Sequence, residues 1–96
     1  MTTEPSRRVW SDLAIHPGDT ISEEIEARQL DIDSVAMQLA VEPRKLRRVL
    51  AGKAHVSADL ALGLERILGI EATFWMNLQT AYDLTLARRK LLTSVS

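Results

Sequence analysis

The sequence predicts an all-α domain of five helices. No stretch of its 96 residues shows the alternating apolar and polar pattern of a half-buried strand. Apolar residues instead recur every three or four positions, as they do along one face of a helix. Helix-starting and helix-ending residues divide these stretches into five. The prolines and glycines among these boundary residues are Pro17, Pro43, Gly52 and Gly69.

The expected organisation is an irregular N-terminal arm over residues 1–15, one domain over residues 16–92 and a C-terminal tail over residues 93–96. The arm shows no helical period, as is common for chain termini. It nevertheless carries four large apolar side chains, which predict that its second half packs on the domain or on a partner. These side chains are Val9, Trp10, Leu13 and Ile15.

The first helix is expected to begin at the motif His16-Pro17-Gly18-Asp19. Proline fits the first helical turn, and acidic residues favour the positive end of the helix dipole. Ile21 and Ile25 supply the apolar side of this helix. We expect it to run to about Gln29.

The second and third helices are short. Either Asp31 or Asp33 is able to cap the second helix, which is expected to end near Ala40. Pro43 opens the third helix, because proline at the first helical position loses no hydrogen bond. Gly52 is expected to be its C-cap.

Ser57 is expected to cap the fourth helix, and Gly69 to end it. The fifth helix is predicted from about Ala72 and carries a broad apolar stripe. It is expected to close with Arg88-Arg89-Lys90, since cations favour the negative end of a helix.

The second and third helices together match a helix-turn-helix. That motif needs a small residue where the helices cross, a compact turn, and apolar anchors at fixed offsets. Ala36 is the small residue and Ala40 occupies the turn. Val41 fills the space between the helices, while Leu46 and Val49 bury the second of them.

A cationic face follows on the third helix. Because its apolar residues face inward, helical spacing puts four bases on the open side and its flanks, namely Arg44, Lys45, Arg47 and Arg48. The first two of these lie in the first turn and are expected to read bases, with Lys53 and His55 meeting the sugar-phosphate backbone. A basic cluster is often only a solvated surface, but its place on the second helix of this motif favours DNA binding.

Charge is unevenly distributed although the formal net charge is only −1. Six acids lie between residues 19 and 33, whereas residues 43–58 hold five bases and no acid. The average therefore does not argue against a nucleic-acid partner. No signal peptide or membrane span is encoded, so we expect a cytoplasmic protein.

Enzymatic and metal-binding functions find no support in the sequence. It has no cysteine, and its two histidines, His16 and His55, lack partners at metal-ligand spacing. Glu23, Glu24 and Glu26 are better explained as a solvated helix face than as a catalytic carboxylate pair. We therefore expect no catalytic residue, no metal and no cofactor.

The aromatic residues of the fifth helix leave two alternatives open, a place in the core or in a dimer interface. Phe74 and Trp75 are adjacent and cannot share one narrow helix face. We expect Phe74 in the core and give both alternatives equal weight for Trp75. The candidate dimer residues are Trp75, Leu78, Tyr82 and Leu86.

Three segments of the chain resemble the HigA antitoxins, a VapI-like branch of the XRE/Cro helix-turn-helix family. The segments are the His16 to Asp19 motif, the helix-turn-helix from Val35 to Lys53, and Phe74-Trp75-Met76-Asn77-Leu78-Gln79 followed by Tyr82-Asp83-Leu84. The last segment is the most specific, because general XRE domains lack it.

The resemblance implies a lambda-repressor-like domain that forms a homodimer and represses its own operon at a palindromic operator. It also implies a cognate HigB/RelE-like toxin, an mRNA-cleaving enzyme that the antitoxin binds and neutralises. The sequence departs from the family pattern at Glu42, whose carboxylate disfavours an end-on phosphate contact at the start of the third helix.

Two functions are therefore compared. The first is a DNA-binding antitoxin whose toxin contacts Trp10 and the acidic surface of Glu23, Glu24 and Glu26. The second is a solitary transcriptional regulator of the same fold without a toxin. A protein-interaction module that has lost DNA binding is a third and weaker possibility, since the cationic helix face is intact.

Overall fold

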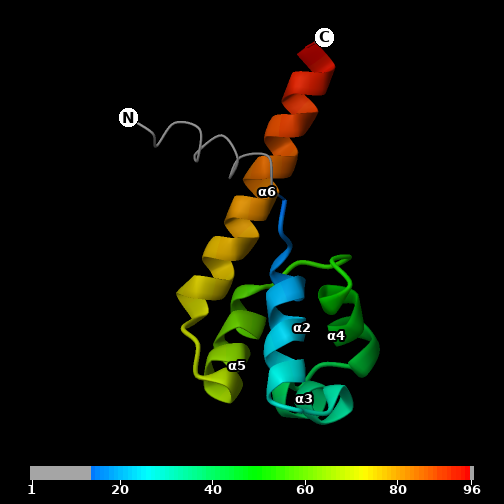
Figure 1. Cartoon of the computed structure of the whole chain (residues 1–96), viewed down its shortest axis with the longest axis vertical. Helices are drawn as coiled ribbons and strands as arrows, with labels where there is room; N and C mark the ends of the chain where they lie inside the picture. The colour runs from blue at the N-terminus through cyan, green and yellow to red at the C-terminus, as the bar shows by residue number, and fades with distance from the viewer. Residues whose placement is uncertain (1–13, 96) are drawn as a thin grey trace.

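The computed structural model describes residues 14–95, and this part of the chain is all-helical (Figure 1). Five helices and no strand are found within it, which confirms the predicted fold class. The expected arm falls almost entirely outside the described residues. The helices are α2 (Pro17–Ala27), α3 (Ile32–Leu39), α4 (Pro43–Leu50), α5 (Ala58–Leu68) and α6 (Ala72–Val95).

The N-terminal ends of α2 and α3 are fixed by side-chain caps. The Gly18 N–H donates to His16 Nδ1 at 2.8 Å, which makes His16 the N-cap of α2. Of the two candidate caps for α3, the structure selects Asp31, whose carboxylate accepts from the Ser34 N–H at 3.0 Å. Each cap satisfies a backbone donor that has no partner inside its helix.

The C-terminal ends of α2 and α4 differ from expectation by one or two residues. Helix α2 stops at Ala27 rather than Gln29, and the C-cap of α4 is Ala51, with Gly52 following it at φ 77°. Ala40 closes α3 in the left-handed region at φ 60°, a conformation that glycine adopts more easily. The turn between α3 and α4 therefore forms with an alanine at a mildly strained position.

One apolar core joins all five helices. Eleven apolar side chains are buried in it, and Trp75 is the largest of those without exposed surface. The other ten core side chains come from α2 to α5 and from the loop before α5: Ile21, Ile25, Val35, Ala36, Leu46, Val49, Val56, Ala61, Leu64 and Leu68. The predicted inward positions of Ile21, Ile25, Leu46 and Val49 are thus confirmed.

The burial of the two aromatic residues at the start of α6 differs from expectation. Phe74 is 42% exposed, so its assignment to the core is wrong. Trp75 is 0% exposed, which contradicts its assignment to a dimer interface, because a side chain without exposed surface offers a partner nothing to contact. The two rings meet edge to face, with centroids 5.0 Å apart. One helical step of about 100° decides which of them turns inward.

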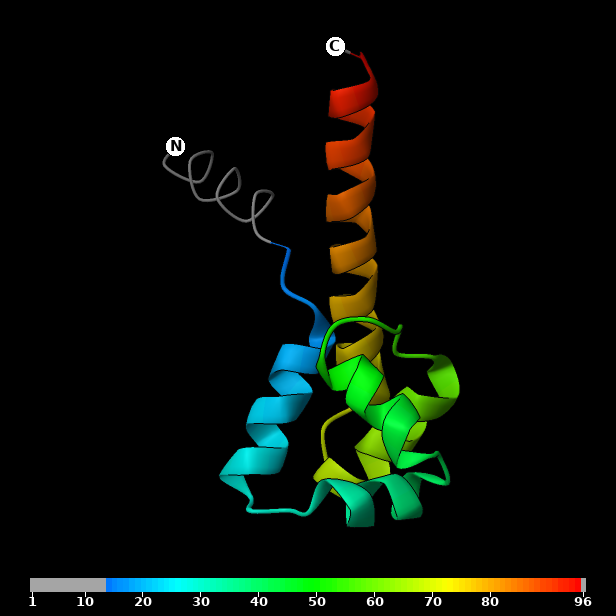
Figure 2. The same ribbon diagram turned by 90° about the vertical axis from the view of Figure 1, so that its right-hand side faces the viewer.

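Helix α6 extends well beyond the bundle formed by the other helices (Figure 2). It continues past Arg88-Arg89-Lys90 to Val95, so residues 93–95 of the expected tail are helical. Leu91 and Leu92 are exposed on this extension. None of the helices between residues 14 and 95 combines the length and apolar character that crossing a membrane requires.

The first turn of α2 packs very closely against the end of α4. A Cβ atom added at Gly18 would overlap the carbonyl oxygen of Val49 and lie 3.0 Å from His16 Nδ1. Only a residue without a side chain permits this approach. Gly18 therefore allows the first turn of α2 to pack directly against the C-terminal end of α4.

We expect Gly18→Ala to lower the free energy of unfolding by about 2 kcal/mol, since overpacking costs about 1–3 kcal/mol and exceeds the gain in helix propensity. Urea denaturation measures the change. Gly63→Ala is the matched control, because its Cβ would meet only the flexible end of Leu39, at 2.6 Å from Cδ2. Equal losses in the two variants would contradict this account of the α2–α4 contact.

Candidate nucleic-acid interface

Helices α3 and α4 form the predicted helix-turn-helix. Ala36 is completely buried where the helices meet, and Val41 packs against the core from the turn. Helix α5 supports this unit, since Arg66 Nη2 donates to the Gln38 carbonyl at 3.0 Å near the end of α3. The motif is therefore held from the side of α5 and from the side of α2.

Helix α4 presents one apolar and one cationic side. Leu46 and Val49 are each 1% exposed and anchor it in the core. The four bases predicted to form the cationic face are all exposed, namely Arg44, Lys45, Arg47 and Arg48. Since the same eight-residue helix supplies both sides, burial of the first fixes the direction of the second.

Three of these bases gather around one surface depression. Arg44, Arg47, Arg48, Ala51 and Lys53 line a cavity of about 470 Å³ that is open to solvent. No carboxylate is among its lining residues. The guanidinium of Arg48 also donates to the Lys53 carbonyl at 3.1 Å, which ties the following loop to the helix. The depression thus gathers positive charge from α4 and from the loop that follows it.

Lys45 and His55 lie apart from this cationic site. They line a second groove of about 520 Å³ between α4 and the start of α5, together with Asp59 and several apolar side chains. The six predicted DNA contacts are thus divided, with four around the depression and two along the neighbouring groove. Glu42 is the N-cap of α4 and makes no side-chain capping hydrogen bond. It is exposed at the start of the helix.

The sequence interpretation missed Gln79, which holds the loop carrying Lys53 and His55. Gln79 is only 4% exposed, and its Oε1 accepts from the Val56 N–H at 2.7 Å. Its Nε2 donates to Asp83 at 2.9 Å and lies 3.4 Å from His55 Nδ1. One signal was available, because Gln79 follows Trp75 by four positions and so shares its inward face.

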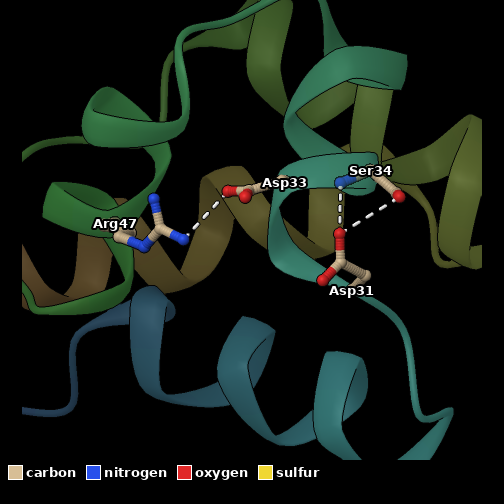
Figure 3. A network of polar contacts seen from close by, with 4 residues as sticks. All are labelled: Asp31, Asp33, Ser34 and Arg47. Carbon is tan, nitrogen blue, oxygen red and sulfur yellow. Dashed lines mark hydrogen bonds and ion pairs between the residues drawn. The ribbon is translucent and has the colours of Figure 1, made fainter.

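Asp33 also takes part in this face, although the sequence suggested for it only a possible capping role. Its Oδ1 accepts from Arg47 Nη2 at 2.9 Å, across the space between α3 and α4 (Figure 3). Asp31 turns instead toward Ser34 of its own helix (Figure 3). The two neighbouring acids therefore have separate partners.

The acidic residues proposed for a toxin contact lie on α2. Glu23 and Glu26 are exposed, while Glu24 is half-buried and pairs with Arg28 at 3.3 Å. Trp10 lies outside the described residues. Between residues 14 and 95 no group of three His, Cys, Asp or Glu side chains has the proximity that a metal site needs.

Comparison with known proteins gives consistent similarities, although no protein-family model matches the sequence. Virulence-associated protein I of Dichelobacter nodosus is 38% identical over 77 residues, which are 79% of this chain and 71% of that protein. The structure is also similar to an addiction module antidote protein of the HigA family from Coxiella burnetii. That similarity has 32% identity, a TM-score of 0.77, and coverage of 85% of this chain and 90% of the other.

A third similarity is to the Pseudomonas aeruginosa antitoxin HigA, whose structure was determined with the higBA promoter. The identity is 28% and the TM-score 0.80, over 88% of this chain and 92% of that one. The described helices thus correspond to nearly the whole length of both solved proteins.

We expect Gln79→Ala to release the loop between α4 and α5, since an unpaired buried N–H costs about 1–3 kcal/mol. Exchange of the Val56 amide should accelerate more than that of a core amide such as Leu64, as measured by NMR. Asn77→Ala is the control, because this nearby amide is exposed and makes no polar contact within residues 14–95. Unchanged protection at Val56 in Gln79→Ala would refute the anchoring role.

Proposed function

The chain belongs to the HigA antitoxins, the VapI-like branch of the XRE/Cro helix-turn-helix family, and on this basis we propose that it is a DNA-binding antitoxin. It represses its own operon and neutralises a RelE-like, mRNA-cleaving toxin in the cytoplasm. The observation that carries the DNA-binding part is the cationic side of α4, exposed on a helix whose opposite side is anchored in the core.

DNA recognition follows from the geometry of α4. The major groove admits an α-helix, and an arginine fork fits guanine O6 and N7. Arg44 is in the first turn, where base contacts concentrate in this motif. The depression between Arg44, Arg48 and Lys53 is suited to a backbone phosphate. Base reading and phosphate binding therefore use adjacent parts of one surface.

A homodimer gives this recognition its strength. One copy offers few contacts, whereas two copies on half-sites about one helical turn apart double them. If the dimer makes about eight phosphate contacts, log affinity falls against log salt with a slope of about −7. We place the dimer contact on the exposed part of α6, where Leu84 is 46% and Leu86 40% exposed. Leu78 and Tyr82 are partly buried and contribute less surface.

The toxin contact is placed on α2 and the N-terminal arm. Glu23, Glu24 and Glu26 give the outer side of α2 a negative charge that is complementary to an RNA-binding, basic toxin surface. Trp10 supplies the arm with a large apolar anchor. The alternative is a solitary regulator, which keeps the α4 surface and needs no acidic contact.

Replacing Arg44 and Arg47 together with alanine should lower affinity for the operator about 100-fold or more, since each removes a contact worth about 1–3 kcal/mol. The probe is the DNA upstream of the gene, titrated in gel-shift assays at physiological salt. Circular dichroism and sedimentation should show unchanged helix content and oligomeric state, because both side chains are exposed.

Arg28→Ala is the control for charge, since Arg28 is the C-cap of α2 and pairs with Glu24. It should retain operator binding. Equal affinity of the Arg44/Arg47 variant and the parent protein would remove α4 as the recognition helix.

Co-expression with the adjacent reading frame tests the toxin part. The parent protein should restore growth and co-purify with the product of that frame. Glu23→Lys with Glu26→Lys should abolish both through charge repulsion and leave operator binding intact. The Arg44→Ala/Arg47→Ala variant should show the opposite pattern. If no toxin-like frame adjoins the gene, or if the parent protein fails to rescue growth, the solitary regulator is the better description.

A further inference from the structure

The ion pair between Asp33 and Arg47 places a carboxylate at the edge of the cationic surface. Asp33 is in the first turn of α3, and its Oδ1 lies 2.9 Å from Arg47 Nη2 on α4. Both side chains are largely exposed, at 62% and 55%. Exposed pairs of this kind contribute little to stability. The ion pair itself therefore adds little to folding stability.

The neighbouring polar residues do not compete for the ion pair between Asp33 and Arg47. Asp31 is engaged by the Ser34 N–H and hydroxyl of its own helix, at 3.0 and 3.2 Å, so it does not compete for Arg47 (Figure 3). Arg48 donates to the Lys53 carbonyl rather than to a carboxylate. Within residues 14–95, Arg47 is the only basic residue of α4 with an ion pair.

We infer that Asp33 is a specificity-determining residue that holds the Arg47 guanidinium in position to read a base and withholds it from the phosphate backbone. This inference rests on the proposed DNA-binding function. It adds a role for α3, a helix to which no DNA-reading residue has been assigned above.

Two physical effects of this ion pair favour specific over non-specific DNA binding. A guanidinium has five N–H donors, and the recorded bond to Asp33 uses one of them, so the others stay available for a base edge. Fixing the side chain in advance also removes part of the entropy cost of ordering it on DNA. The ion pair thus orders the Arg47 side chain before DNA binds.

The charge of Asp33 has the second effect. A carboxylate beside Arg47 neutralises part of its attraction for phosphate and repels phosphate directly. Non-specific binding depends almost entirely on such attraction, whereas specific binding also uses base contacts. Asp33 therefore weakens non-specific binding more than specific binding, which raises the ratio between them.

The test compares Asp33→Asn with the parent protein on two probes. One is the duplex that the parent protein enriches from a random-sequence pool, and the other is a scrambled duplex of the same composition. Asp33→Asn should bind the scrambled duplex more tightly, with a salt slope steeper by about one unit per subunit. The ratio of specific to non-specific affinity should fall about tenfold, the size of one lost base contact.

Asp19→Asn is the matched control. Asp19 also lies in the first turn of a helix, α2, and is exposed without a polar side-chain contact in the described part of the chain. It loses the same charge and the same favourable dipole interaction. Its affinity ratio should equal that of the parent protein, whereas a general effect of charge would lower the ratio in both variants and overturn the inference.

A double-mutant cycle with Arg47→Ala separates positioning from other effects. In the Arg47→Ala background, Asp33→Asn should lower the affinity ratio much less, because the group that it positions is absent and only the direct repulsion of phosphate is lost. A ratio that falls equally in both backgrounds, or that does not fall in the single variant, overturns the role of Asp33. If the parent protein enriches no sequence at all, the proposed DNA-binding function fails, and this inference fails with it.

Discussion

The contact between the start of α2 and the end of α4 is the constraint on which the rest of this structure depends. Gly18 has no side chain, so its backbone lies directly against the Val49 carbonyl. His16 caps α2 and lies with its ring edge to face against Tyr82 of α6, at 4.8 Å between centroids. The last turn of α4 thereby packs against α2, and His16 links the start of α2 to α6. Arg47 and Arg48 belong to that turn, so the direction of the cationic surface depends on a close backbone contact on the opposite side of α4.

Helix α6 positions the same surface from a second direction. Trp75 fills the core, and Gln79, one turn later, holds the Val56 backbone of the loop that carries Lys53 and His55. The segment from Phe74 to Gln79 thus supports the candidate DNA surface without being part of it. Glu65 of α5 accepts from the Ala72 N–H at 3.1 Å and fixes where α6 begins. Because these contacts join distant parts of the chain, a change in α6 is expected to reach the DNA surface through packing and hydrogen bonds.

Charge acts on this protein through its placement rather than its sum. The net charge of −1 conceals a basic depression on α4 and an acidic outer side of α2. At physiological salt, charges interact strongly only within about 8 Å, so the two surfaces are able to serve different partners. Asp33 shows the same principle at shorter range, since its carboxylate lies 2.9 Å from Arg47 and neutralises part of the charge of that guanidinium.

The sequence by itself determined the helices, most of their boundaries and the exposed side of α4, because these depend on local signals. Pro17, Asp31 and Ser57 act within one turn of their own positions, and helical spacing alone separates Leu46 and Val49 from the bases. Only the tertiary structure decided which of Phe74 and Trp75 is buried and which acid pairs with Arg47. It also decided that Gln79 holds a loop 23 residues earlier in the chain. These outcomes depend on the angles at which the helices pack against one another. Local residue spacing predicts neither which of two adjacent residues of α6 faces the core nor the 2.9 Å contact between α3 and α4.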